Sequence, residues 1–153
     1  MKEFIENIYV NKELQVVLFE EICAKYEITL IEIYLLLFLY EHEIECAKEF
    51  VNKLKIAKSH VSTSLRNLEE KGYIQGKYKG EDHRTIHLYL CDKAMEIVSE
   101  IEIVQKNYVS ILQKGFSEEE KVVFHDFLSR LTENVHYYLK DCVKKEVKNE
   151  SSA

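Results

Sequence analysis

Small hydroxyl, imidazole and basic side chains are concentrated between residues 58 and 66, at the start of a segment with helical spacing. The residues that could contact a polyanion there are Lys58, Ser59, His60, Ser62, Thr63 and Arg66. No acidic residue occurs in this segment before Glu69, and the helix dipole favours anions at a helix start. Such side chains can reach base edges and phosphates in a DNA groove. The composition therefore favours contact with a nucleic acid.

A basic hairpin is expected directly after this segment. Residues 73–79 alternate apolar and polar side chains, and residues 85–90 do the same, which predicts two half-exposed strands. The expected tip is Gly80-Glu81-Asp82-His83-Arg84, which places Arg84 at the end of the hairpin. An extended arginine suits a narrow minor groove, where the negative potential is enhanced. The lysines that could contact phosphates are Lys77 and Lys79 on the hairpin and Lys48 and Lys55 before it.

Apolar spacing predicts the helices that would position these side chains. Residues 47–54 and 58 to about 71 each have one apolar helical face, and a three-residue link joins them. Gly72 stands where a left-handed helix cap is expected. Upstream, Thr29 and Glu32 form a capping box for a helix that is apolar nearly all round. This pattern is typical of a central buried helix that supports a two-helix reading module.

Longer amphipathic segments flank the module on both sides. Residues 1–26 form an apolar stripe, and Asp92 is a plausible N-cap for a helix of about 20 residues. A second capping box, Ser117 with Glu120, predicts the start of the last helix. These stripes are longer than one chain of this size can cover, so a dimer with interleaved first and last helices is expected.

The middle of the chain resembles the MarR family of bacterial transcription regulators. The resemblance rests on AKSHVSTSLRNLEEKGYI, the basic strand after it, the triplet Asp82-His83-Arg84, and LCDKA at residues 90–94, where the family usually has L-T-x-K-G. It implies that Arg84 enters the minor groove and that Asp82 holds the wing by an ion pair. It also implies a dimer that places two recognition helices about one DNA turn apart on a pseudo-palindrome.

The expected fold is therefore mainly α with a small β-hairpin wing, a winged helix-turn-helix with N- and C-terminal dimerisation helices. One MarR-like domain is expected over residues 1–153. Its DNA-binding core would occupy 28–91, its dimerisation helices 1–26 and 92–147, and a flexible tail 148–153.

Net charge alone argues against a nucleic-acid partner, but its distribution reverses that conclusion. The chain has 21 Lys and Arg against 27 Asp and Glu, a net charge of −6. Residues 47–91 hold nine basic and five acidic residues, net +4, which leaves 12 and 22, net −10, elsewhere. Phosphate affinity depends on the local field, so a basic centre on an acidic body can bind DNA.

Other classes of chemistry find little support in the sequence. The four cysteines are widely separated without a C-x-x-C pair, and the loop 41–46 fits no metal-ligand spacing, so neither a metal nor another cofactor is expected. No glycine-rich phosphate loop or nucleophile motif indicates an enzyme. The N-terminus lacks a signal-peptide pattern, and the longest apolar run is too short for a membrane span. A cytoplasmic protein with reduced thiols, and with no membrane partner, is expected.

Sensing is predicted with less detail. MarR-like proteins commonly bind small molecules between the dimer helices and the reading module, and the aromatic residues that could line such a pocket are Tyr26, Tyr34, Phe38 and Tyr108. Aromatic residues at helical spacing are more often core, and that alternative is favoured. Cys23 and Cys142 are alternative sites of a thiol switch.

Together these observations predict a sequence-specific, homodimeric regulator that binds double-stranded DNA, a repressor of MarR type released by a small ligand or an oxidant. The alternative is a winged-helix module for protein–protein contacts. That alternative predicts exposed apolar residues on the recognition helix, whereas this helix offers Ser, Thr, His and Arg.

Overall fold

The computed structural model describes the backbone of residues 2–42, 46–79 and 82–150, and the side chains of residues 2–41, 46–78 and 84–139. The chain divides into two compact units, Met1–Val109 and Ser110–Ala153. Each unit is described by itself below.

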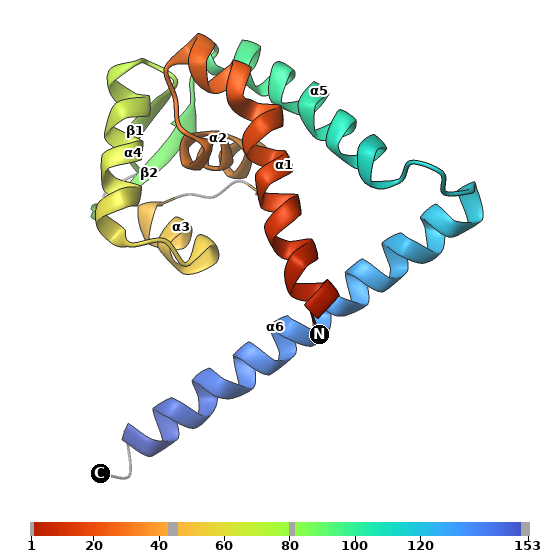
Figure 1. The fold of residues 1–153 in the computed structure, drawn as a ribbon. Coiled ribbons are helices and arrows are strands. Elements are labelled where there is room, and N and C mark those ends of the chain that lie inside the picture. Colours follow the sequence, from red (N-terminus) through yellow and green to blue (C-terminus); the bar gives the residue numbers. More distant parts are fainter. Residues whose placement is uncertain (1, 43–45, 80–81, 151–153) are drawn as a thin grey trace. The chain divides into compact units, whose positions relative to one another are not determined.

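Helices and one hairpin make up the described residues, in the order that the sequence predicted (Figure 1). The elements are α1 (Lys2–Tyr26), α2 (Leu30–His42), α3 (Ala47–Leu54), α4 (Lys58–Glu70), β1 (Ile74–Lys79), β2 (Asp82–Leu90), α5 (Ala94–Leu112) and α6 (Glu118–Glu150). The prediction of a mainly α winged helix-turn-helix is confirmed. Within the described ranges, no helix is both long and apolar enough to cross a membrane.

Two helix boundaries differ from the prediction. Helix α5 begins at Ala94 rather than after an N-cap at Asp92, because residues 92 and 93 form a turn in which Ala94 N–H donates to Cys91 O at 2.8 Å. Helix α6 continues to Glu150, into the segment expected to be a tail from residue 148. The sequence KKEVKNE consists largely of residues with good helix propensity and has no glycine or proline to end the helix.

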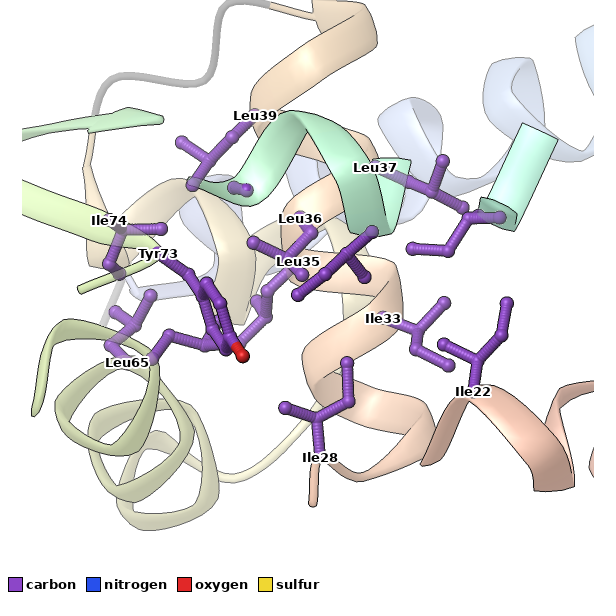
Figure 2. Packing of buried hydrophobic residues seen from close by; sticks show 14 of the residues in the cluster. Ile22, Ile28, Ile33, Leu35, Leu36, Leu37, Leu39, Leu65, Tyr73 and Ile74 are labelled. Atoms are coloured by element: carbon purple, nitrogen blue, oxygen red, sulfur yellow. The ribbon is translucent and has the colours of Figure 1, made fainter. Parts of the chain in front are cut away.

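Helix α2 forms the centre of the first unit. It contacts α1, α4 and β2, and its residues Ile33, Leu35 and Leu36 are fully buried. Figure 2 shows these side chains in one cluster with Ile22 of α1, Leu65 of α4 and Ile74 of β1. A helix that is apolar all round can bury every face only in such a central position, as the sequence predicted.

Both predicted capping boxes are present. The Thr29 backbone N–H donates to Glu32 Oε2 at 2.7 Å, and Thr29 Oγ1 accepts from the Glu32 N–H at 3.3 Å. Ser117 and Glu120 make the same reciprocal pair at 2.7 and 3.2 Å. These pairs satisfy backbone donors at the helix starts, which explains why α2 and α6 begin where they do.

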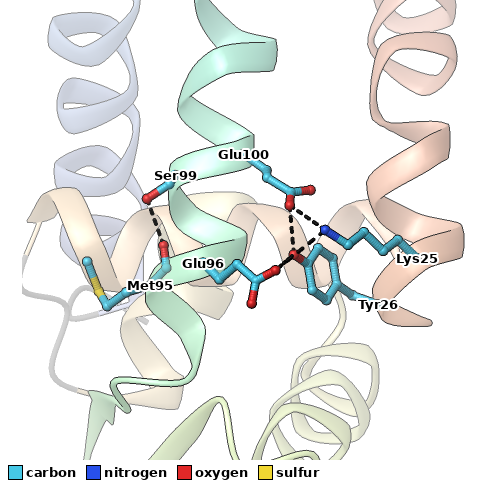
Figure 3. A network of polar contacts seen from close by, with 6 residues as sticks. All are labelled: Lys25, Tyr26, Met95, Glu96, Ser99 and Glu100. Carbon is cyan, nitrogen blue, oxygen red and sulfur yellow. Dashed lines mark hydrogen bonds and ion pairs between the residues drawn. The ribbon is translucent and has the colours of Figure 1, made fainter.

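The end of α1 is joined to α5 by polar contacts. Lys25 Nζ lies 2.5 Å from Glu100 Oε1 and 3.5 Å from Glu96 Oε1. The Tyr26 hydroxyl lies 3.0 Å from Glu96 Oε1 and 2.9 Å from Glu100 Oε1. Figure 3 shows the two side chains of α1 pointing toward the two carboxylates of α5. The hydrogen bond from Lys25 lowers the pKa of Glu100, so this contact favours the ionised carboxylate.

Candidate nucleic-acid interface

Helices α3 and α4 form a helix-turn-helix whose connection is only residues 55–57. Lys55 adopts a left-handed conformation, φ 52°, and its N–H donates to Val51 O at 3.1 Å, which ends α3. Phe50 of α3 is fully buried, and its ring meets Phe38 of α2 edge-on at 6.4 Å. These contacts hold α3 against the core, and α3 in turn contacts α4.

Helix α4 has one buried and one polar, exposed side. Val61, Ser64, Leu65 and Leu68 face the core. The side chains predicted to meet DNA are exposed, namely Lys58, Ser59, His60, Ser62, Thr63 and Arg66. The first turn contains no acidic residue, so the positive end of the helix dipole is not neutralised there. The structure thus gathers all six predicted side chains of α4 on its solvent side.

The hairpin is attached to α4 near its base. Glu69 Oε1 accepts a hydrogen bond from the Gly76 N–H at 3.1 Å, and Gly76 pairs with Leu88 in the antiparallel ladder. A groove of about 320 Å³ separates helix and hairpin, with Ser62, Arg66 and Lys77 among the residues that line it. The predicted contacts of the helix and of β1 therefore border the same groove.

The outer part of the hairpin differs from the prediction. Strand β2 begins at Asp82 instead of Thr85, because a register shift between Tyr78 and Lys79 lets Lys79 pair with Asp82. Arg84 consequently lies within a strand and is exposed, rather than in a five-residue tip. Tyr78 and Ile86 are 52% and 51% exposed, because this part of the hairpin extends past the core that covers Ile74. The predicted buried face is thus limited to the base of the hairpin.

Some predicted contacts fall outside the described side chains. The side chains of Lys79 and Asp82 are not described, so the ion pair that the family resemblance implies for Asp82 stays a prediction. Lys48, Lys55 and Lys77 are exposed, as a phosphate contact requires.

The four aromatic residues predicted for a ligand pocket lie in three different environments. Tyr34 donates to Gln15 Oε1 at 2.6 Å, and Gln15 Nε2 donates to the Tyr108 hydroxyl at 3.3 Å, so Tyr34 and Tyr108 belong to one network. Phe38 packs on Phe50 instead, and Tyr26 joins α5. Burial raises the pKa of Tyr34, so its hydroxyl remains a donor. The ligand site stays a prediction.

The thiols give little indication of a switch. Cys23 is half-buried, and burial together with the nearby Glu32 carboxylate raises the pKa of its thiol. A raised pKa lowers the thiolate fraction and hence the reactivity toward oxidants. Cys142 lies outside the described side chains. Among the described residues, no group of three His, Cys, Asp or Glu side chains could hold a metal ion.

Sequence reasoning missed the polar residues that attach the reading elements to one another. Glu69 and Asn67 appeared to be ordinary exposed positions of α4, yet Glu69 binds the hairpin and Asn67 Nδ2 donates to Glu32 Oε1 at 2.8 Å. The capping box identified one role of Glu32, but nothing in the local sequence indicated the second.

Comparison with known proteins gives a consistent result. A family model described as transcriptional regulator SarA/Rot matches residues 17–101, more than half of the chain. The HTH-type transcriptional regulator YdgJ of Bacillus subtilis (strain 168) is 26% identical over 102 residues, 67% of this chain and 62% of that protein. The matched part thus spans less than two thirds of that relative. The HTH-type transcriptional regulator BilQ of Clostridioides difficile (strain CD3) is 24% identical over 119 residues, 77% of this chain and 80% of that protein.

Solved structures share the fold. The crystal structure of MarR superposes with a TM-score of 0.78 at 21% identity, covering 89% of this chain and 92% of that one. A Listeria monocytogenes protein assigned to the MarR family, complexed with 26mer DNA, gives a TM-score of 0.72 at 22% identity and covers 88% of each chain. The resemblance to the MarR family is therefore confirmed for the fold.

Proposed function

Because the chain belongs to the SarA/Rot family of transcriptional regulators, we propose that it binds double-stranded DNA sequence-specifically, as a homodimer. The observation that supports this most directly is the exposed polar first turn of α4, which contains no acidic residue, beside exposed basic residues of the hairpin. Helix α4 enters the major groove in this proposal, and Arg84 of the hairpin reaches the adjacent minor groove.

The length of the hairpin suits that division of roles. From Leu90, whose partner Ile74 is buried, strand β2 runs six residues to Arg84. At about 3.4 Å per residue this is ~20 Å, close to half of the ~34 Å helical repeat of DNA. One unit can therefore contact both grooves. The solved Listeria protein with 26mer DNA supports a DNA partner for a protein of this fold.

The homodimer is supported by apolar side chains that one chain leaves exposed. In α1 these include Phe4, Ile5 and Ile8, at 61%, 48% and 53% exposure, and α6 adds Phe127 and Leu131 at 55% and 51%. Both sets repeat at helical spacing, and stripes of this length usually mark an interface. A two-fold dimer presents two copies of α4 to a pseudo-palindrome.

Regulation in this proposal is repression released by a small ligand or an oxidant, in a cytoplasmic protein without a catalytic step. An oxidant would act through a thiol, and a ligand through a pocket beside the flanking helices. Operator affinity measured on the reduced protein before and after treatment with hydrogen peroxide distinguishes release by an oxidant from release by a ligand. A fall in affinity that dithiothreitol reverses supports release by an oxidant. Unchanged affinity refutes release by an oxidant and favours release by a small ligand.

Selection of bound sequences from a random duplex pool tests the DNA-binding proposal. We expect a pseudo-palindrome with half-sites about one turn apart, bound with an affinity that falls steeply with salt. Light scattering should give the mass of two chains, and Leu131→Asp should halve it. A pool that shows no enrichment with the dimeric, reduced protein would refute direct sequence reading and favour the protein–protein module.

A further inference from the structure

We infer that Glu32 is a positioning residue for α4, which it holds in register through Asn67. The inference rests on the proposed role of α4 as the DNA-reading helix, because it assigns a DNA-binding effect to a residue remote from the exposed side of that helix. It adds a second role to a residue whose first role, in the capping box of α2, is fully accounted for.

The two oxygens of Glu32 serve two different elements. Oε2 accepts the Thr29 N–H at 2.7 Å and completes the capping box, while Oε1 accepts from Asn67 Nδ2 at 2.8 Å. The Glu32 residue is only 3% exposed, so water cannot readily replace either donor. A buried carboxylate is tolerated only when its oxygens are hydrogen-bonded. The amide of Asn67 is therefore part of what makes this burial possible.

The hydrogen bond between Asn67 and Glu32 constrains the orientation of α4, which apolar packing alone does not. Three of the four buried residues of α4, namely Val61, Leu65 and Leu68, are apolar, and hydrophobic burial is non-directional. The bond between Asn67 and Glu32 has a preferred length and angle, so it restricts rotation and sliding of α4 on α2. A reading helix needs its side chains within about 0.5 Å and 10–20° of their productive positions.

A second contact on the same row of α4 reinforces the first. Lys71, the C-cap residue of α4, stands four residues after Asn67, donates to the Tyr26 carbonyl at 3.4 Å and lies 3.5 Å from Glu27 Oε2. Four residues before Asn67 stands Thr63, exposed on the proposed DNA side. Residues four apart lie above one another on a helix. One row of α4 thus runs from the DNA side to the connection between α1 and α2.

The end of α1, directly before that connection, is bonded to α5 by Lys25 and Tyr26 (Figure 3). The orientation of α4 is therefore tied by polar contacts to α1 and α5, the helices that lead into the proposed dimer. A change in this connection would alter how the dimer presents α4, without any change in the residues that touch DNA.

Exchanging the carboxylate of Glu32 and the amide of Asn67 between the two positions tests the inference. Asn67→Asp places a second carboxylate against Glu32 Oε1, and we expect operator affinity to fall at least about tenfold, or ~1.4 kcal/mol. Glu32→Gln keeps a capping-box residue, and rotation of the Asn67 amide restores a donor–acceptor pair, so affinity should stay within about threefold. In the double variant the new amide at position 32 donates to the new carboxylate at position 67. Affinity should then return to within about threefold of the wild type.

Charge provides the matched control. Asn67→Asp adds one negative charge to the reading module, and Asn52→Asp on the exposed surface of α3 adds the same charge away from Glu32. The control should lose less than about threefold. Restoration by the double variant cannot arise from a surface charge, because that variant still carries the added carboxylate at position 67. A double variant as weak as Asn67→Asp, or an Asn67→Asp variant no weaker than Asn52→Asp, overturns the inference.

Hydrogen exchange of α4 backbone amides gives a readout that needs no DNA. The amides of residues 65–68 should exchange about tenfold faster in Asn67→Asp and return toward wild-type rates in the double variant. If Asn67→Asp does not fold, Asn67→Ala replaces it in both assays, with the same expected loss and Asn52→Ala as its control. Failure of the wild type to select a duplex would refute the proposed function. Wild-type exchange rates in Asn67→Asp would refute only the inference that Glu32 positions α4 through Asn67.

Discussion

Replacement of Arg84 by alanine should weaken operator binding about 150-fold. Arg84 is exposed on β2, ~20 Å along the strand from the buried base of the hairpin. A hydrogen bond to a charged group contributes ~1.5 kcal/mol at the lower end of its range. A dimer loses the contact at both half-sites, so the expected loss is ~3 kcal/mol, or about 150-fold.

Salt dependence distinguishes this loss from a general weakening. Each phosphate-type contact contributes about −0.9 to the slope of log K against log salt. Two lost contacts should make the slope of Arg84→Ala shallower by about 1.8. Fluorescence anisotropy with the selected operator at several salt concentrations measures both quantities, while circular dichroism and light scattering check that helix content and dimer mass are unchanged.

Two controls bracket the result. Arg84→Lys retains the charge and should keep most of the slope, although it loses the planar fork that suits a narrow groove. Arg130→Ala removes an exposed arginine from α6, where it lies 3.5 Å from Asp126, and should leave affinity unchanged. A wild-type slope for Arg84→Ala, with affinity retained, would show that the hairpin arginine does not take part in DNA binding.

Three further substitutions probe specificity, packing and pH dependence. Ser62→Ala should change the selected sequence more than non-specific affinity, and an equal loss on all duplexes would count against base contact there. Phe50→Ala should lower the free energy of unfolding by about 3–5 kcal/mol in urea titration, because Phe50 is fully buried against Phe38; a loss under about 1 kcal/mol would contradict that packing. The pKa of Glu100 is lowered by its hydrogen bond to Lys25, so its contribution is present above the ordinary value of 4.5 and is lost as pH falls. Glu100→Gln should therefore flatten the fall in urea midpoint below pH 4.5, and an unaltered pH profile would contradict this.

The order and type of the elements could be predicted because local signals agreed with one another. Helix α3 occupies residues 47–54 as expected, since its apolar residues repeat at helical spacing. The capping boxes at Thr29 and Ser117 located the starts of α2 and α6, because side chain and backbone satisfy each other within four residues. Such signals depend only on near neighbours in the chain.

The remaining features depend on contacts between distant segments. The early start of β2 at Asp82 follows from a register shift between Tyr78 and Lys79, and no residue type in the sequence indicates that shift. Alternation placed Tyr78 and Ile86 on one face of the hairpin, but it could not show that this part extends beyond the core. Likewise, the second hydrogen bond of Glu32 joins residues 35 positions apart, so it becomes visible only once α2 and α4 are packed.

The close approach within the hairpin has a consequence for how related sequences vary. A Cβ atom added at Gly76 would lie 2.7 Å from Ile86 Cγ2, an overlap that the short, branched side chain at position 86 cannot easily relieve. Positions 76 and 86 should therefore change together among relatives of this chain. Where residue 76 is alanine or larger, we expect at position 86 a side chain without a branch at Cβ. An alignment of relatives would reveal such a correlated pair.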